Sequence, residues 1–129
     1  MNPDTFAWPD DGKQHYGVPN PQYDPRVCGL EIVASFSEPD LGYEFNDWIL
    51  WRHIGSGEYY CASDSGCSCP MPFERYTSLS SLTRCATLAD ALREFDAWNK
   101  GYDKRPLVDS FAAHTEIESK WKAGQEGKP

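Results

Sequence analysis

Three cysteines close together in the chain, Cys61, Cys67 and Cys69, carry the clearest potential for chemistry. They form the pattern C-x5-C-x-C, and His53 is a nearby histidine. Thiolates and imidazole are common zinc ligands, but structural zinc sites usually use cysteine pairs with roughly two to four residues between them. Because C-x-C is tighter, the pattern favours an interpretation without metal or other cofactor. A small zinc-stabilised module with these four ligands is the alternative.

The same residues suggest a second chemistry, thiol-dependent catalysis. Cys67 or Cys69 would be the nucleophile and His53 the base, because a reactive cysteine needs a neighbour that lowers its pKa. However, the sequence contains no nucleophile elbow, phosphate-binding loop, zinc-protease motif or dinucleotide fingerprint. We therefore expect a non-catalytic protein and keep the thiol enzyme as an alternative.

The chain is acidic, with 20 Asp and Glu against 12 Lys and Arg among its 129 residues. Its first 50 residues contain nine of the acids and only two of the bases. This balance disfavours direct binding to nucleic acid, which depends on Lys and Arg. The acids favour a solvated surface, and a docking face for a basic partner or a nucleic-acid mimic is the alternative. No targeting segment or long apolar run is present, so we expect a cytoplasmic protein with reduced thiols.

The periodicity of apolar residues predicts a single α+β domain. A three-stranded antiparallel meander is expected to pack against one main helix, with a C-terminal helix and an irregular N-terminal arm. The expected strands are 29–37, 43–54 and 58–63, and the expected helices are 87–100 and 111–123. The expected boundaries are an arm at 1–27, a domain at 28–123 and a disordered tail at 124–129.

Finer patterns predict which side chains share a face. Strand 43–54 has large apolar groups on both faces, which is typical of a central strand. In strand 29–37, alternation puts four apolar side chains on one side: Leu30, Ile32, Ala34 and Phe36. Ser78 is expected to cap a short turn in 77–83, Thr87 and Asp90 to form a capping box, and Gly124 to end the last helix. In that helix the predicted inner side is Phe111, His114, Ile117 and Trp121.

The segments GLE (29–31), YEFNDWILW (43–51) and YYCASDSGCSCPMPFE (59–74) resemble a family of small uncharacterised proteins of mycobacteriophages and other actinobacteriophages. The resemblance extends over about residues 23–100 and includes the unusual string DSGCSCP. Cys61 and Met71 depart from the family pattern. The resemblance implies a small phage accessory protein in the cytoplasm of its actinobacterial host, and it implies no known activity. Our own first hypothesis is that the protein binds a host or phage protein and modulates host processes.

The resemblance also draws attention to the segment 63–73. One glycine and two prolines fix its backbone, Phe73 can enter the core, and the same rigidity presents Asp64 and Ser65 to a partner. We therefore expect a binding segment, with no membrane or nucleic acid as partner. Its predicted residues are Asp64, Ser65, Gly66, Cys67, Ser68, Cys69, Pro70 and Phe73.

Overall fold

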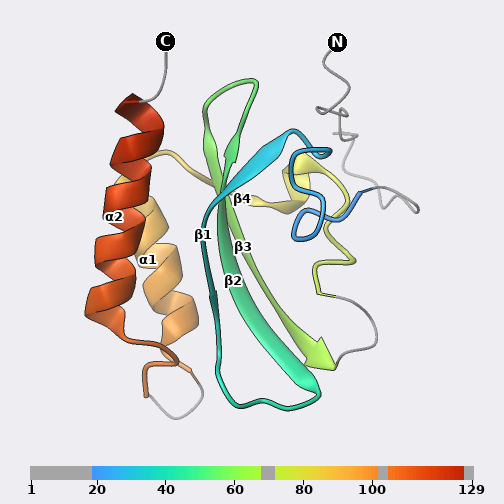
Figure 1. Cartoon of the computed structure of the whole chain (residues 1–129), viewed down its shortest axis with the longest axis vertical. Helices are drawn as coiled ribbons and strands as arrows, with labels where there is room; N and C mark the ends of the chain where they lie inside the picture. The colour runs from blue at the N-terminus through green and yellow to red at the C-terminus, as the bar shows by residue number, and fades with distance from the viewer. Residues whose placement is uncertain (1–18, 68–71, 102–104, 127–129) are drawn as a thin grey trace.

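The fold is a four-stranded antiparallel sheet with two helices on one face (Figure 1). The computed structural model describes residues 19–67, 72–101 and 105–126. The elements are β1 (Leu30–Ser37), β2 (Glu44–His53), β3 (Tyr59–Cys67), the 3-10 helix η1 (Leu79–Ser81), β4 (Thr83–Cys85), α1 (Leu88–Asn99) and α2 (Ser110–Glu126). The α+β class is confirmed, whereas the expected number of strands is wrong by one. Neither described helix is long and apolar enough to cross a bilayer.

The additional strand, β4, is short and lies at the edge of the sheet. It pairs with the start of β3, where Tyr59 lies opposite Cys85 and Cys61 opposite Thr83. Three residues are too few to show an alternating pattern, so the sequence does not reveal this strand. The expected turn in 77–83 is confirmed as η1, which Ser78 caps.

Strand β3 is longer than expected and includes the first half of the segment 63–73. Residues 64–67 are small and polar, a composition typical of loops. In the structure they pair with residues 44–47 of β2, which places Cys67 opposite Glu44. Long-range pairing therefore overrides the local preference of this stretch.

A β-bulge in β1 changes which side chains share a face. Ile32 lies opposite Trp51, but Ala34 lies opposite the next residue of β2, Leu50, so the extra residue is Val33. The bulge turns Ala34 towards the helices, whereas Leu30 lies on the opposite face. The expectation that Leu30, Ile32, Ala34 and Phe36 share one face is therefore wrong.

Both faces of the sheet are covered, so the core has two layers. On the helix face, Trp48 contacts Phe95 of α1 edge to face, with ring centroids 5.4 Å apart. On the other face, Trp51 packs against Phe73 in the same manner at 5.6 Å. Because β2 contributes a buried tryptophan to each layer, its prediction as a central strand is confirmed.

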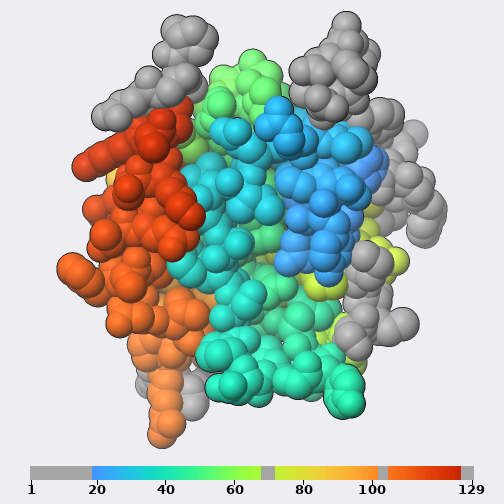
Figure 2. All heavy atoms as spheres, in the orientation of Figure 1, coloured from blue at the N-terminus to red at the C-terminus, as the bar shows by residue number. Residues whose placement is uncertain are grey.

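Irregular chain and the short helix η1 cover the second face. Residues 19–29 and 72–82 lie there, across the sheet from α1 and α2 (Figure 1), and Figure 2 shows 19–29 in blue beside β1. The indole of Trp51 donates a hydrogen bond to the carbonyl of the buried Pro21 at 2.9 Å. This part of the expected N-terminal arm is therefore integral to the core, while residues 1–18 lie outside the described ranges.

The two helices begin as the sequence indicates, but α2 ends later. Thr87 and Asp90 form the expected capping box, and the Asp109 carboxylate accepts from the backbone N–H of Ala112. Helix α2 continues through Gly124 to Glu126, so the predicted stop at Gly124 is wrong. Gly124 instead lets the helix approach β3, because a Cβ there would lie 2.7 Å from the Tyr59 hydroxyl oxygen. The predicted inner position of Phe111 is also wrong, since it is 83% exposed.

Candidate functional site

The structure divides the predicted binding segment between a strand and the core. Ser65, Gly66 and Cys67 are exposed at the end of β3, and Asp64 is half-buried. Phe73 is fully buried and is therefore a core residue, not a contact surface. The remaining predicted residues of this segment, Ser68, Cys69 and Pro70, lie outside the described residues.

The Asp64 side chain binds the backbone at Phe73, where the chain comes back to the sheet after β3. Its carboxylate accepts a hydrogen bond from the backbone N–H of Phe73 at 2.8 Å. Phe73 has a φ of 61°, a left-handed conformation that is costly for a bulky residue. The Asp64 hydrogen bond and the burial of the ring against Trp51 offset this cost. Asp64 is thus committed to the fold, while the expected rigidity of the segment 63–73 stays a prediction.

The structure does not bring together the proposed zinc ligands that it describes. Cys61 is buried on the helix face, whereas Cys67 is exposed at the far end of β3, roughly 20 Å of strand away. His53 lies at the opposite end of β2 from Glu44, the residue paired with Cys67. Across the described ranges, no three His, Cys, Asp or Glu side chains form a group able to hold a metal ion.

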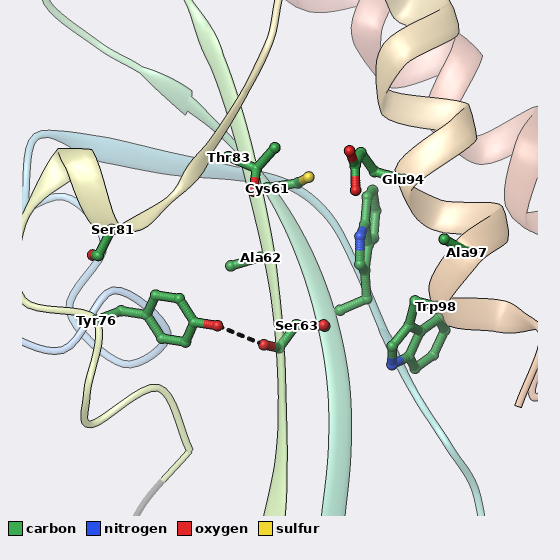
Figure 3. Close-up of a pocket in the computed structure, with 10 residues that line it drawn as sticks. Cys61, Ala62, Ser63, Tyr76, Ser81, Thr83, Glu94, Ala97 and Trp98 are labelled. Carbon is green, nitrogen blue, oxygen red and sulfur yellow. Dashed lines mark hydrogen bonds between the residues drawn. The ribbon is translucent and has the colours of Figure 1, made fainter. Parts of the chain in front are cut away.

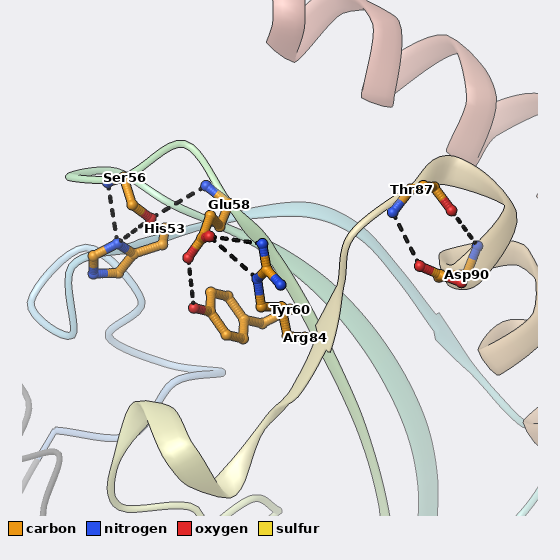
Figure 4. Close-up of polar contacts among 7 residues, drawn as sticks. All are labelled: His53, Ser56, Glu58, Tyr60, Arg84, Thr87 and Asp90. Atoms are coloured by element: carbon orange, nitrogen blue, oxygen red, sulfur yellow. Dashed lines mark hydrogen bonds and ion pairs between the residues drawn. The ribbon is translucent and has the colours of Figure 1, made fainter.

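The same separation weighs against the thiol enzyme with Cys67 as nucleophile. His53 Nδ1 lies 2.8 Å from the hydroxyl of Ser56 in the β2–β3 turn (Figure 4), and roughly 30 Å of strand separates His53 from Glu44.

Near the same turn, the Glu58 carboxylate accepts a hydrogen bond from the Tyr60 hydroxyl at 3.1 Å and forms an ion pair with Arg84 at 2.9 Å. The Tyr60 hydrogen bond, followed by the charge of Arg84, holds the pKa of the Glu58 carboxyl below its usual value.

Cys61 forms a close thiol pair with Cys85 instead. The Sγ atoms of Cys61 and Cys85 are 3.5 Å apart on the helix face of the sheet. The hydrogen bond to Cys85, together with burial, raises the pKa of the Cys61 thiol. Burial and the nearby Asp24 carboxylate raise the pKa of Cys28 to about 12. Cys28 and Cys61 therefore behave as small apolar core residues rather than as nucleophiles.

A pocket that the sequence does not indicate opens beside Thr83, the first residue of β4 (Figure 3). Its volume is about 320 Å³. Residues of β3 form its floor, α1 supplies Glu94, Ala97 and Trp98 on one side, and Tyr76 and Ser81 lie on the other. The helical spacing of Glu94 and Trp98 is visible in the sequence, but the late start of β4 at Thr83 is not.

The aromatic walls of this pocket are held by hydrogen bonds. The Trp98 indole donates to the Asn46 side-chain oxygen at 2.9 Å, and the Asn46 amide in turn donates to Glu38 at 2.9 Å. On the opposite wall, the Tyr76 hydroxyl donates to the Ser63 carbonyl at 2.8 Å. Burial, more than the nearby Asp64, raises the pKa of Tyr76, which keeps this donor protonated. The two rings are therefore preorganised.

Beyond the pocket, β3 presents an open edge. The Glu58 carbonyl accepts from the His53 N–H at 2.7 Å, so even-numbered residues of β3 direct their backbone groups towards β2. The backbone groups of the odd-numbered residues point away from β2. β4 pairs with this outer edge of β3 only as far as Cys61. In the described part of the chain, no strand covers the outward groups of Ser65 and Cys67.

Comparison with known proteins places the chain in a family. The family model described as "Domain of unknown function (DUF7574)" matches residues 19–120, so the chain belongs to this family. The matched range includes the whole sheet, α1, the pocket and the open edge of β3. Neither the curated proteins nor the solved structures yielded a match.

Proposed function

We propose that this member of the DUF7574 family is a non-catalytic protein-binding domain that takes up an extended segment of its partner along the open edge of β3. The observation that supports the proposal is the unequal length of β3 and β4. Past Cys61, β3 continues for about 20 Å with its outward backbone groups facing away from β2.

An uncovered edge of this kind is a template for another strand. Sheets usually protect such edges with charged side chains, proline or a covering segment, because they otherwise pair with other chains. Here the exposed end of β3 is Ser65, Gly66 and Cys67, which have neither charge nor proline. Addition of a partner strand supplies main-chain hydrogen bonds, and pockets beside the edge select its side chains.

The partner is proposed to be a host or phage protein, in keeping with the resemblance to small actinobacteriophage proteins. The net charge of −8 supports a partner segment that is basic. A zinc centre with these ligands, or Cys67 as a nucleophile with His53 as its base, is less well supported, because Cys67 lies far along the sheet from both Cys61 and His53.

Comparison of Ser65→Pro with Ser65→Ala tests the proposal. Proline removes the outward N–H of residue 65 and leaves the hydrogen bonds between β2 and β3 intact, whereas alanine removes only the hydroxyl. Each immobilised protein is incubated with lysate of an actinobacterial host, infected and uninfected, and retained proteins are quantified by mass spectrometry.

We expect wild type and Ser65→Ala to retain the same partner and Ser65→Pro to lose most of it, while all three melt as folded domains. Equal retention by Ser65→Pro would contradict docking at this edge. Failure of the wild-type domain to retain any partner would contradict the protein-binding function.

A further inference from the structure

The pocket beside the open edge contains a carboxylate that has no basic partner among the described residues. Glu94 lines the pocket from α1 and is half-buried. Within the described ranges, none of the ion pairs or side-chain hydrogen bonds involves this carboxylate. The preceding residue in the chain, Arg93, is already engaged in an ion pair with Asp90. Of the described residues that line the pocket, none carries a positive charge.

Aromatic rings lie on both sides of the same space. Trp98 is four residues after Glu94 and projects from the same face of α1, while Tyr76 is on the opposite wall (Figure 3). A cation beside a tryptophan or tyrosine ring is attracted by the negative face of the ring. Because hydrogen bonds to Asn46 and Ser63 fix both rings, little ordering is needed on binding.

We propose that this pocket binds the arginine side chain of a peptide strand that adds to the edge of β3. The proposal rests on the proposed function and specifies the chemistry of its partner. A guanidinium forms two parallel hydrogen bonds to a carboxylate and stacks on aromatic rings, and lysine does neither as well. Of the possible cationic side chains, arginine therefore fits Glu94 and Trp98 best.

The position of the pocket agrees with the geometry of an added strand. Side chains of a strand alternate between the two faces of the sheet. A strand that continues the sheet beyond β4 thus sends every second side chain towards Glu94 and Trp98, and the others towards Tyr76 and Ser81 (Figure 3). The volume of about 320 Å³ is at the small end of the range for ligand pockets, which suits one long side chain.

In the domain without a partner, one backbone carbonyl of this edge already accepts a hydrogen bond from a side chain of the domain itself. The Tyr76 hydroxyl donates to the outward carbonyl of Ser63, the residue at the floor of the pocket. A carbonyl oxygen accepts two donors, so an incoming backbone N–H can bind this carbonyl beside the Tyr76 hydroxyl without releasing the Tyr76 ring. The pocket and the edge thus form one continuous recognition surface.

The test uses four acetylated and amidated peptides: TVTRTVT, the same peptide with lysine or with the neutral isostere citrulline at the centre, and TVTETVT. Binding is measured by titration of backbone amide signals in NMR spectra. We expect the arginine peptide to bind at least tenfold more tightly than the citrulline peptide, with lysine between them. The signals that shift are expected to be those of β3 residues 63–67 and of α1 near Glu94.

Two variants of the pocket and one control separate charge recognition from net charge. Glu94→Gln is expected to reduce the affinity for the arginine peptide to that for the citrulline peptide. Glu94→Lys is expected to prefer TVTETVT. The control is Glu118→Gln, which changes the net charge equally on the exposed face of α2 and should bind as wild type does.

Equal binding of the arginine and citrulline peptides, or unchanged binding by Glu94→Gln, would overturn the proposal. If Ser65→Pro then weakens all peptides alike, the docking edge stands and only the arginine pocket is wrong. If no peptide shifts the wild-type signals at millimolar concentration, both assignments are wrong.

Discussion

Replacing Gly124 by alanine tests whether this glycine is a packing residue or a helix stop. An alanine Cβ would lie 2.7 Å from the hydroxyl oxygen of Tyr59, a distance that requires the helix or the ring to move. Overpacking of this kind costs about 1–3 kcal/mol. The better helix propensity of alanine returns about 0.9 kcal/mol. We therefore expect Gly124→Ala to lower the free energy of unfolding by roughly 1 kcal/mol.

A second substitution isolates the cause. In a Tyr59→Phe background the hydroxyl is absent, and the other atoms near the new methyl group are 3.8 Å away, an ordinary contact. Tyr59→Phe by itself loses the hydrogen bond to the Trp121 carbonyl, worth about 1 kcal/mol. In this background Gly124→Ala should stabilise α2 by up to about 0.9 kcal/mol, so the coupling between the two sites is about 2 kcal/mol.

The assay is urea denaturation followed by tryptophan fluorescence and circular dichroism, for wild type, both single variants and the double variant. Ala123→Gly, at the exposed neighbouring position, is the matched control for helix propensity in the last turn. If Gly124→Ala stabilises the wild-type protein by as much as Ala123→Gly destabilises it, no close contact exists and the reasoning is wrong.

Three further predictions concern the second core layer, the turn and the thiols. Phe73→Ala should cost about 3–5 kcal/mol in the free energy of unfolding, because it empties the space against Trp51; a loss below 1 kcal/mol in urea denaturation would contradict its role as a core residue. Glu58 has a lowered pKa, so its stabilising effect is present above the usual value of 4.5 and is lost as the pH falls through the lowered value. Thermal melts between pH 6 and 3 should therefore show a smaller loss of stability for Glu58→Gln than for wild type, and identical pH profiles would contradict this. Iodoacetamide labelling at pH 8, located by mass spectrometry, should modify the exposed Cys67 well before Cys28, whose pKa is about 12, and the reverse order would contradict the assigned burial.

Features set by neighbouring residues were predictable. The capping box of α1 needs only Thr87 and Asp90, three residues apart, and it forms as expected. The two apolar faces of β2 indicated a strand buried on both sides, and Trp48 and Trp51 are indeed 2% and 0% exposed. In each case the sequence contains the whole signal, because the partners are close in the chain or the pattern repeats along one element.

Features that depend on a distant partner were not predictable. The small polar residues 64–67 become strand only because β2 offers a partner of matching length. The β-bulge at Val33 changes which side chains of β1 lie on each face of the sheet, and no local sequence pattern predicts it. The candidate site was missed for the same reason, since Glu94, Tyr76 and the floor of β3 meet only because β4 does not begin until Thr83.

The sequence by itself determined the α+β class, the order of the main elements, the two-sided burial of β2 and the acidic charge, since these follow from composition and periodicity. Tertiary structure alone decided the fourth strand, the separation of His53 from the exposed thiol of Cys67 and the pocket next to an open edge. The physical reason is that strand register and the relative lengths of paired strands are set by contacts between distant residues. A one-dimensional pattern limits these contacts but does not specify them.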